Sequence, residues 1–285
     1  MLKRYPIASY FILTYLVSWV FLIPAFRALL NAGWAQDGLS TIPPVVFVGL
    51  LGVFGPTIVA LILSGYRGGR QGVKSLLKRY LIWRVNWGWY VFVLFVPLLL
   101  FFFAVWLGAV FSGTFIGVPI LKNIVLVVIG AIAITIPFGP LPEELGWRGY
   151  ALPHLLRKFG PVVSSLVLGF FWTFWHIPAF FVPGVAIPSA FALTAGTIFL
   201  YLLNNTALSF IFTGIFLRTR GSVLLAILLH AGSNASSNII YSIFPASGAS
   251  TSTMLLVYVI NIVLMTVVGL GLLTWKKNAE TVIRL

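Results

Sequence analysis

The stretch FGPLPEELGWRGY, residues 138 to 150, places two adjacent glutamates and an arginine in a chain of which 60% is hydrophobic and 8% is charged. The chain has four acidic residues in all, so Glu143 and Glu144 are half of its side-chain carboxylates. An ionised carboxylate inside hydrocarbon costs about 2.5 kcal/mol or more, so an acid kept there is a functional candidate that faces protein or water. If the surrounding chain spans a membrane, this stretch is the first candidate for a site.

The remaining composition is typical of a polytopic membrane protein. The mean hydropathy is +1.08, and apolar runs of about 20 residues recur, each long enough to cross the hydrocarbon as a helix. The first run is too long for the core of a signal peptide. We therefore predict one all-α membrane domain, residues 1–285, with about eight transmembrane helices and no room for an ordinary soluble domain. The expected spans are 7–27, 43–64, 89–112, 122–141, 161–182, 190–215, 221–241 and 253–274.

The basic residues are distributed as a membrane topology requires. Sixteen of the 18 Lys and Arg residues fall on one side if the spans alternate, and only Arg27 and Lys122 fall on the other. The positive-inside rule then places both termini in the cytoplasm of a multi-pass protein, which lies in the cell membrane if the cell is prokaryotic. A net charge of +14 would also suit nucleic acid, but the bases lie between apolar runs instead of in one patch, so no nucleic-acid partner is expected.

Between the second and third spans, apolar and basic residues recur with the spacing of a helix. The apolar positions are Val73, Leu76, Leu77, Tyr80 and Leu81, and the opposite face carries Lys74, Ser75, Lys78 and Arg79. This pattern predicts an amphipathic helix at the membrane surface. The simpler interpretation is a connector that lies on the headgroups, and the alternative is a surface that attracts anionic lipid or acts as a gate.

The two glutamates differ in the partners that the sequence offers them. Arg148 lies four residues after Glu144, with the acid on the N-terminal side, which is the favourable orientation for an ion pair on a helix. Glu143 has no comparable partner. The alternative is that the glutamates have no functional role and are solvated charges at the cytoplasmic end of a helix. That alternative would require no histidines nearby.

Two of the three histidines lie inside expected spans. His176, in FWTFWHIPAF, belongs to span 161–182, and His230, in LLHAGSNASSN, belongs to span 221–241. A single histidine there is usually a core residue with a hydrogen-bond partner, but two on different spans, together with an unpaired glutamate, favour a site. His154, in ALPHLL, is expected at the interface and outside the site.

Polar residues form a stripe on each of two expected spans. His230 and Asn234 are four residues apart and share one helix face. This face continues through Ser237, Asn238 and Tyr241, and span 190–215 carries a second stripe at Thr194, Thr197, Tyr201, Asn205, Ser209 and Thr213. The stripes line a water-accessible cavity or form hydrogen bonds between helices, and for the second stripe the two interpretations are equally open.

A glutamate, two histidines and an asparagine in one cavity favour peptide hydrolysis. A carboxylate removed from water is a stronger base, and an imidazole can position a water molecule for it. A histidine and an asparagine amide are suitable donors to the oxyanion that forms when water attacks an amide carbonyl. The chain has no cysteine, and its other acids, Asp37 and Glu280, fall in an outer loop and in the tail, which excludes thiol catalysis and a Ser-His-Asp triad.

These residues form three motifs that resemble a known family. The motifs are Glu-Glu-x-x-x-Arg at Glu143, Glu144 and Arg148, aromatic-x-x-x-His at Trp172 and His176, and His-x-x-x-Asn at His230 and Asn234. In this order, within residues 140–240, they resemble the CPBP intramembrane proteases, also called the Abi family, which comprises CAAX proteases and bacteriocin-processing enzymes. The resemblance extends to EELGWRGYALPHLLRKFGP and LLKRYLIWRVNW, and elsewhere it is mostly hydropathy.

The resemblance implies an intramembrane endopeptidase that hydrolyses a peptide bond of a membrane-associated protein or peptide. Its active site would open toward the cytoplasmic side, and its partners would be that substrate and the lipid bilayer. A CAAX-type activity requires a prenylated substrate, whereas prokaryotic relatives are associated with peptide processing or bacteriocin immunity. Both substrate classes stay open.

The resemblance also implies a role for each motif residue. Glu143 would be the general base, and His176 would help to hold the attacking water. The oxyanion site would be formed by His230 and Asn234. Support for the site would come from Glu144, Arg148 and Trp172, the last of which stands where the family usually has phenylalanine.

A catalytic zinc ion is the alternative to a metal-free reaction. Glu143, His176 and His230 could supply three protein ligands, with water in the fourth position. The His-Glu-x-x-His spacing of zincins is absent. A glutamate mechanism without metal accounts for the same residues, so water activated by Glu143 is the favoured interpretation.

Straight helices would not bring these residues to one depth. At 1.5 Å per residue, His230 lies about 12 Å into its span and His176 about 22 Å, while Glu143 falls near the cytoplasmic end of span 122–141. Two solutions are open: the span with His176 begins well inside the cytoplasm, or the chain re-enters so that the glutamates lie deeper. A break before the glutamates is expected in either case from the prolines at 137, 140 and 142.

Two other functions fit parts of the pattern. A secondary transporter also places Glu, Arg and His inside the membrane, but it does not predict these motifs in this order, and the sequence shows no paired short segments in matching halves. A catalytically silent immunity or scaffold protein is the third alternative, because a fold does not fix a function. The presence of every expected polar residue argues against it.

Overall fold

The computed structural model describes residues 4–33, 42–114, 119–244 and 250–274, and its secondary structure there is helical. Asp37 and Glu280 lie outside the described residues. So do the two chain ends, whose expected place in the cytoplasm stays a prediction. The helices are α1 (Pro6–Asn31), α3 (Val45–Val53), α4 (Gly55–Leu77), η2 (Lys78–Leu81), α5 (Gly88–Ser112), α6 (Ile124–Phe138), α7 (Pro140–Glu144), η3 (Leu145–Ala151), α8 (Leu152–Leu156), α9 (Pro161–Trp175), α10 (Ile177–Phe180), α11 (Ala195–Arg218), α12 (Val223–Ile243) and α13 (Thr251–Thr274).

The lengths and composition of the helices confirm a polytopic helical membrane bundle. In the described part of the chain, α1, α5, α11, α12 and α13 are each long and apolar enough to cross a membrane. Two bent pairs, Val45–Val53 with Gly55–Leu81 and Ile124–Phe138 with Pro140–Leu156, raise the number from five to seven if each pair is one span. The expected span 161–182 is instead the 15-residue helix α9 followed by the short α10, so α9 is too short to be counted as an eighth long span.

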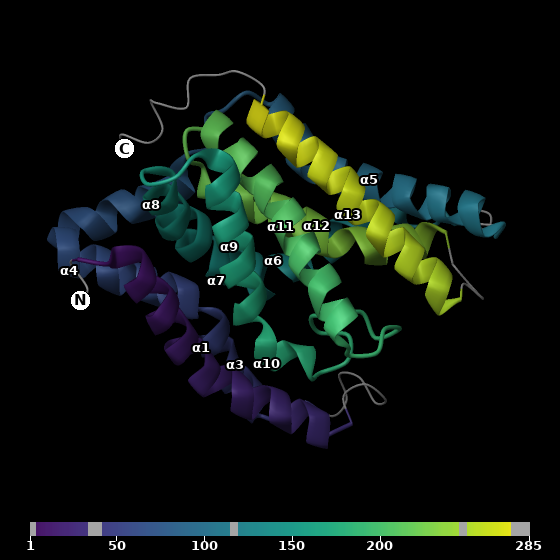
Figure 1. The fold of residues 1–285 in the computed structure, drawn as a ribbon, viewed down its shortest axis with the longest axis horizontal. Coiled ribbons are helices and arrows are strands. Elements are labelled where there is room, and N and C mark those ends of the chain that lie inside the picture. Colours follow the sequence, from purple (N-terminus) through teal and green to yellow (C-terminus); the bar gives the residue numbers. More distant parts are fainter. Residues whose placement is uncertain (1–3, 34–41, 115–118, 245–249, 275–285) are drawn as a thin grey trace.

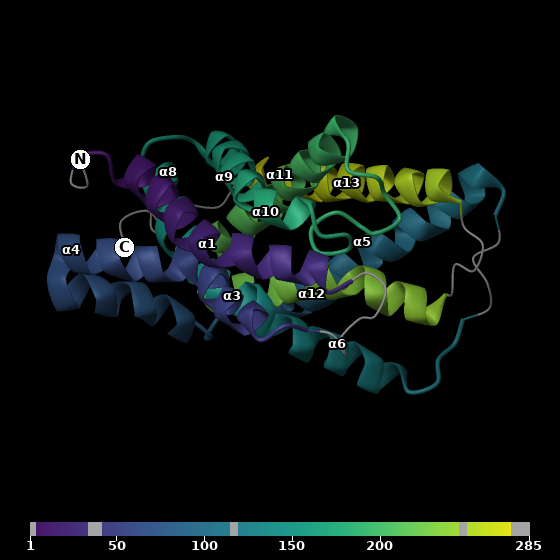
Figure 2. The ribbon, with the colours of Figure 1, turned by 90° about the horizontal axis from the view of Figure 1, so that it is seen from below.

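The helices leave the glutamate segment at the centre of the bundle. Figure 1 shows α1 and α3 packed along one edge and α5 and α13 along the opposite edge, with α9, α11 and α12 between them. In Figure 2, turned by 90°, α6 lies along one face beside α12. The segment formed by α7, η3 and α8 packs against α4, α9 and α12, and all of its residues from Pro142 to Pro153 are buried.

The expected break before the glutamates is confirmed. Helix α6 ends at Phe138, and Gly139, with φ −160° and ψ −66°, separates it from α7, which begins at Pro140. Proline has no N–H to continue a helix and its ring clashes with the preceding turn, which favours a new helix start here. The axis bends by 46°, and the segment after the bend, η3, is a π-helix, a local geometry that is frequent at functional sites.

Helix α4 reverses direction at Gly69. The backbone there has φ 55° and ψ −149°, a conformation that glycine adopts without a side-chain clash. A Cβ added at Gly72 would lie 2.4 Å from the carbonyl oxygen of Ser64, a contact that two residues eight positions apart make only if the chain turns back. The returning leg is helical over the predicted amphipathic stretch up to Leu77 and continues as η2. Its expected faces are only partly separated, because Leu77 and Leu81 are exposed. It packs against the glutamate segment through Leu76 and η2, and its place at a membrane surface stays a prediction.

Candidate active site

Glu143 is a buried carboxylate held by two tryptophans. Its side chain is 4% exposed, and its Oε2 accepts hydrogen bonds from the indole Nε1 of Trp172 at 2.9 Å and of Trp147 at 3.3 Å. Its Oε1 lies 3.2 Å from the position that a Cβ at Gly139 would take, so the glycine at the helix break leaves the space that this oxygen occupies. The carboxylate is therefore fixed through one oxygen by neutral donors.

Glu144 has a different environment, composed of charged and titratable partners. Its Oε1 accepts from Arg148 Nη1 and from His230 Nδ1, both at 2.8 Å, and its side chain is completely buried. The predicted i, i+4 pair with Arg148 is thus confirmed. The contact with His230 joins α7 to α12, and the two residues are 86 positions apart in the sequence. No local spacing predicts such a contact.

Arg148 is a fully buried guanidinium enclosed by aromatic rings. Its Cζ lies 4.3 Å from the ring centroid of Trp172 and 3.6 Å from that of Phe212. A cation over a ring face is attracted by the negative face of the π system, most strongly where water is excluded. Its Nε and Nη2 have no hydrogen-bond partner among the described residues, so the ion pair with Glu144 and the rings are what hold this charge in place.

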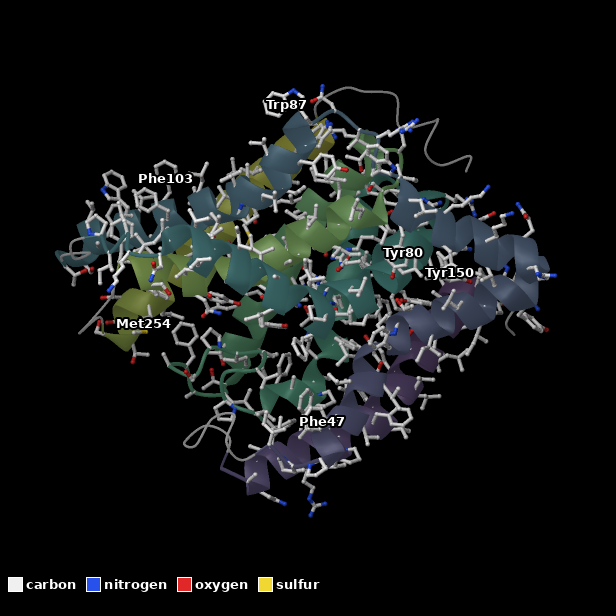
Figure 3. All side chains as sticks on the ribbon, turned by 180° about the vertical axis from the view of Figure 1, so that it is seen from behind. Phe47, Tyr80, Trp87, Phe103, Tyr150 and Met254 are labelled. Atoms are coloured by element: carbon white, nitrogen blue, oxygen red, sulfur yellow. The ribbon has the colours of Figure 1, made fainter. Side chains whose placement is uncertain are left out.

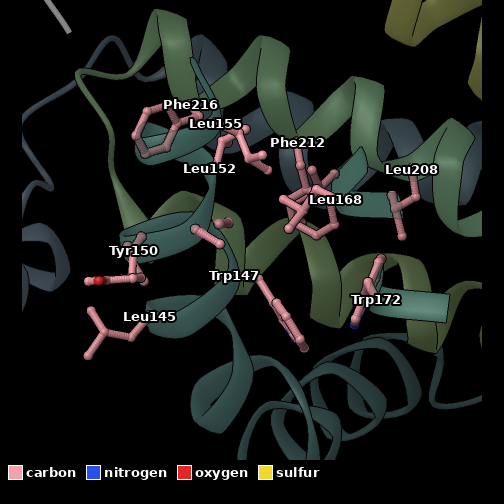
Figure 4. Close-up of a cluster of buried hydrophobic side chains, with 14 of the residues drawn as sticks. Leu145, Trp147, Tyr150, Leu152, Leu155, Leu168, Trp172, Leu208, Phe212 and Phe216 are labelled. Carbon is pink, nitrogen blue, oxygen red and sulfur yellow. The ribbon is translucent and has the colours of Figure 1, made fainter. Parts of the chain in front are cut away.

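Trp172 contacts most of the candidate site. Besides its bond to Glu143 and its contact with Arg148, its ring centroid lies 5.2 Å from that of His230 and 5.8 Å from that of His176, in edge-on geometry. Figure 4 shows Trp172, Trp147 and Phe212 gathered in the buried cluster from α9, η3 and α11. A phenylalanine at this position could make the ring contacts but not the hydrogen bond.

His176 and His154 have the same local arrangement in two places. The Nδ1 of His176 lies 2.8 Å from the carbonyl oxygen of Trp172, and the Nδ1 of His154 lies 2.7 Å from that of Tyr150, in both cases four residues earlier. A carbonyl oxygen only accepts, so both Nδ1 atoms carry hydrogen. His154 directs its Nε2 to Arg67 Nη1, 3.3 Å away, and it lies outside the glutamate cluster as the sequence predicts. His176 lies against Trp172 and Tyr201 at the end of α9.

Asn234 is the one motif residue that the structure does not join to the others. It lies one turn after His230 on α12, on the predicted common face, but its side chain is exposed whereas His230 is buried. The second polar stripe is partly interhelical, because Ser165 of α9 donates to Thr213 of α11 at 2.7 Å. Thr197 and Tyr201 of this stripe line a recess that has no room for a water molecule, and the glutamates do not line it.

Two aromatic residues of the site are not singled out in the sequence. Trp147 lies four residues after Glu143, the same spacing that identifies Arg148 as the partner of Glu144, so that spacing was an available signal. Phe212 lies on α11 among other apolar residues, and nothing in its local sequence distinguishes it. Its contact with Arg148 depends on how α11 packs against η3.

The side chains do not form the zinc site that the sequence leaves as an alternative. Both site histidines direct Nδ1 to a partner within the protein, a carboxylate or a carbonyl, which is the orientation of many metal-bound histidines. However, in residues 4–33, 42–114, 119–244 and 250–274 no three His, Asp or Glu side chains are grouped closely enough to hold a metal ion. Glu143, His176 and His230 therefore do not fit a three-ligand site in this arrangement.

The fold and the site together define a polytopic helical membrane protein with a glutamate pair, an arginine and two histidines gathered around a broken helix. Residues 124–236, which include every motif residue, match the family model described as type II CAAX prenyl endopeptidase Rce1-like. Over 88 residues the chain is 34% identical to the CAAX prenyl protease 2 of Methanococcus maripaludis. These residues are 31% of this chain and 32% of that protein, so the chain spans about a third of the length of the curated relative it matches. The resemblance to the CPBP family of CAAX proteases is confirmed.

Proposed function

We propose that this protein is an intramembrane endopeptidase that hydrolyses a peptide bond of a membrane-associated protein, with Glu143 as the general base that activates water. The observation that carries the proposal is the buried carboxylate of Glu143, oriented through Oε2 by two indole N–H groups beside a separate Glu144–Arg148–His230 network. The matches to CAAX prenyl proteases support the reaction class.

In the proposed reaction, Glu143 removes a proton from a water molecule while the water oxygen attacks the carbonyl carbon of the substrate. The protonated Glu143 then gives that proton to the peptide nitrogen as the carbon–nitrogen bond breaks, which releases an amine and a carboxylic acid that loses its remaining proton to solvent. Trp172 and Trp147 engage Oε2, so Oε1 is the atom that we assign to proton transfer. A fixed base within hydrogen-bond reach of its proton is the first requirement of general base catalysis.

We assign the water to His176 and the oxyanion to His230 with Asn234. Because the Nδ1 of His176 carries hydrogen, the Nε2 of the neutral ring is an acceptor that can orient a water O–H. His230 donates Nδ1–H to Glu144, so donation from its Nε2 to an oxyanion requires the protonated ring. Asn234 is exposed one turn away, and its role requires that the substrate fill the space beside it.

Glu144 and Arg148 act through His230 in this proposal. The ion pair is inaccessible to substrate because both side chains are completely buried. Its carboxylate oxygen fixes the orientation of the His230 ring, as carboxylates do for catalytic imidazoles elsewhere. We therefore class Glu144, Arg148 and Trp172 as positioning residues.

The substrate class is tested with purified protein in lipid vesicles and a library of fluorogenic peptides, each made with and without a prenylated C-terminal cysteine. We expect cleavage of prenylated peptides in preference to their unprenylated forms, and cleavage that survives a strong chelator. Cleavage that chelator abolishes and zinc restores would replace the metal-free mechanism by a metal-dependent one. Equal cleavage of both peptide forms would remove the CAAX-type substrate and leave the peptidase.

One observation favours a second function, a secondary transporter. Transporters of several folds have broken helices at their substrate sites, and this chain has two bent pairs, with angles of 47° and 46°. The same vesicles distinguish the functions, because a transporter would move solute across the bilayer and leave every peptide intact. That result would contradict the peptidase.

A further inference from the structure

We propose that residues 70–87, which we call the basic arm, form a surface that binds anionic phospholipid headgroups. The arm comprises the returning leg of α4, η2 and the connection to α5. Its occupant is the negatively charged surface of the bilayer in which the protein resides. This inference is independent of the proposed peptidase activity.

The outward side of the arm combines bases with large apolar side chains. Arg70, Lys74, Lys78 and Arg84 are exposed, and so are Leu77, Leu81, Trp83 and Trp87. Leu81 is 73% exposed and Trp87 is 75% exposed, and Figure 3 shows Trp87 at the outer edge of the molecule. Apolar side chains interspersed with Lys and Arg are the composition of helices that lie in the headgroup region.

The bases of the arm have no acidic partner in the described part of the chain. The only acids there are Glu143 and Glu144, which are 4% and 0% exposed and belong to the site. Arg70, Lys74 and Lys78 form no hydrogen bond or ion pair with any described residue. Their charges are therefore available to a negatively charged surface, whose attraction falls off within about 10 Å at ordinary ionic strength.

The inward side of the arm is fixed to the protein. Ser222 donates to the carbonyl oxygen of Ile82 at 2.6 Å, and the Tyr80 hydroxyl donates to the carbonyl oxygen of Leu141, two residues before Glu143, at 3.2 Å. The side chain of Leu76 is buried, and its Cδ1 lies 3.2 Å from the position of a Cβ at Gly149. Because this side is anchored, the bases and the exposed apolar residues are presented together on the other side. A connector that only joined two spans would not need this division.

The test uses the absence of cysteine from the chain, which makes a single introduced thiol unique. Leu81→Cys is labelled with a fluorophore, and the protein is reconstituted in phosphatidylcholine containing an equal small fraction of nitroxide-labelled phosphatidylglycerol or nitroxide-labelled phosphatidylcholine. Since each base near an anionic surface changes lipid partition about five-fold, we expect several-fold stronger quenching by the phosphatidylglycerol quencher. The preference should fall toward one in about 1 M salt, where the screening length is about 3 Å.

Charge-neutralising variants locate the effect. The triple variant Arg70→Gln, Lys74→Gln, Lys78→Gln should lose the phosphatidylglycerol preference at position 81. The control variant Arg27→Gln, Lys122→Gln, which neutralises two exposed bases outside the arm, should keep it. A label at Phe103→Cys on α5, also exposed, should be quenched equally by both lipids. The proposal would be overturned if both lipids quenched the label at position 81 equally, or if neither lipid quenched it. It would also be overturned if the preference for phosphatidylglycerol persisted in the triple variant or in about 1 M salt.

Discussion

Two neighbouring carboxylates of this protein have opposite surroundings. Glu143 accepts from two neutral indole N–H groups and has no direct contact with a described cation, whereas Glu144 accepts from a guanidinium and an imidazole through a single oxygen. Both are buried. Since their positions in the chain differ by one residue, the difference arises from the helix faces to which they belong and from the helices packed against those faces.

The two environments differ in what a bound proton would disrupt: an ion pair at Glu144 and none at Glu143. A proton on Glu144 would leave the buried charge of Arg148 without its counter-ion, and an unpaired charge in a protein interior is strongly destabilising. A proton on Glu143 breaks no ion pair. In the proposed function, Glu143 therefore does the chemistry and Glu144 maintains the geometry of Arg148 and His230.

The largest effect is expected for Glu143→Gln. Glutamine keeps an oxygen that accepts from both indoles, so the fold should be unchanged, but it cannot accept a proton from water. We expect a loss of roughly 10³-fold in kcat/KM, within the range for removal of a general base. Peptide cleavage by the purified variant measures the loss, and thermal unfolding in the same detergent serves as its control. Activity within ten-fold of the wild-type protein would contradict the role of Glu143 as the general base.

Glu144→Gln should reduce stability where Glu143→Gln does not. Removal of one partner from a buried ion pair costs about 3–5 kcal/mol, because the remaining charge is left unpaired. The unfolding midpoint in denaturant provides the measurement. The double variant Glu144→Gln, Arg148→Met removes both charges and should recover most of the loss, and a double variant as unstable as the single one would show that the pair is not the cause.

The two histidines with matching backbone contacts provide the next test. His176→Gln should lower kcat about 10²-fold, because water would lose its orienting acceptor. His154→Gln removes the same contact with the carbonyl four residues earlier, but outside the site. Because substitutions away from a functional site usually have small effects, kcat should stay within about two-fold of the wild-type value. Steady-state kinetics on both variants decide the matter, and equal losses would mean that the backbone contact, not the site, explains the effect.

The smallest effect is expected from one hydrogen bond to Glu143. Trp172→Phe keeps a ring beside Arg148 and the histidines but removes the Nε1–H donor. A bond to a charged group is worth at least about 1.5 kcal/mol, and Trp147 still donates to the same oxygen, so we expect roughly a ten-fold loss in kcat with little change in KM. Trp175→Phe is the matched control, because the Nε1 of Trp175 is buried without a hydrogen-bond partner among the described residues and its ring packs on Trp147 and His176. Similar kinetic losses in both variants would assign the effect to ring packing.

Local spacing in the sequence predicts the parts of the site that lie on one helix. The all-helical membrane bundle, the break before the glutamates and the Glu144–Arg148 pair all follow from hydropathy, proline chemistry and the i, i+4 rule. The same spacing joins Glu143 to Trp147, which donates to it. These features need no knowledge of which helices are neighbours.

The parts that the sequence does not predict depend on helix packing. The choice of Glu144 over Glu143 as the partner of His230 depends on the rotation of α12, and the same rotation leaves Asn234 exposed. The enclosure of Arg148 by Phe212 depends on the position of α11. The expected span 161–182 is shorter because its helix ends at Trp175, which places His176 at a helix end instead of inside a continuous span.

The most direct test of the central role of Glu143 is the fate of the water oxygen. After many turnovers in water enriched in ¹⁸O, the released carboxylate of the substrate and the peptide fragment containing Glu143 are analysed by mass spectrometry. If Glu143 acts as a base on water, the label appears in the product carboxylate and Glu143 stays unlabelled. Label in the Glu143 carboxylate would mean that Glu143 attacks the substrate itself and is regenerated by hydrolysis, which would contradict the account.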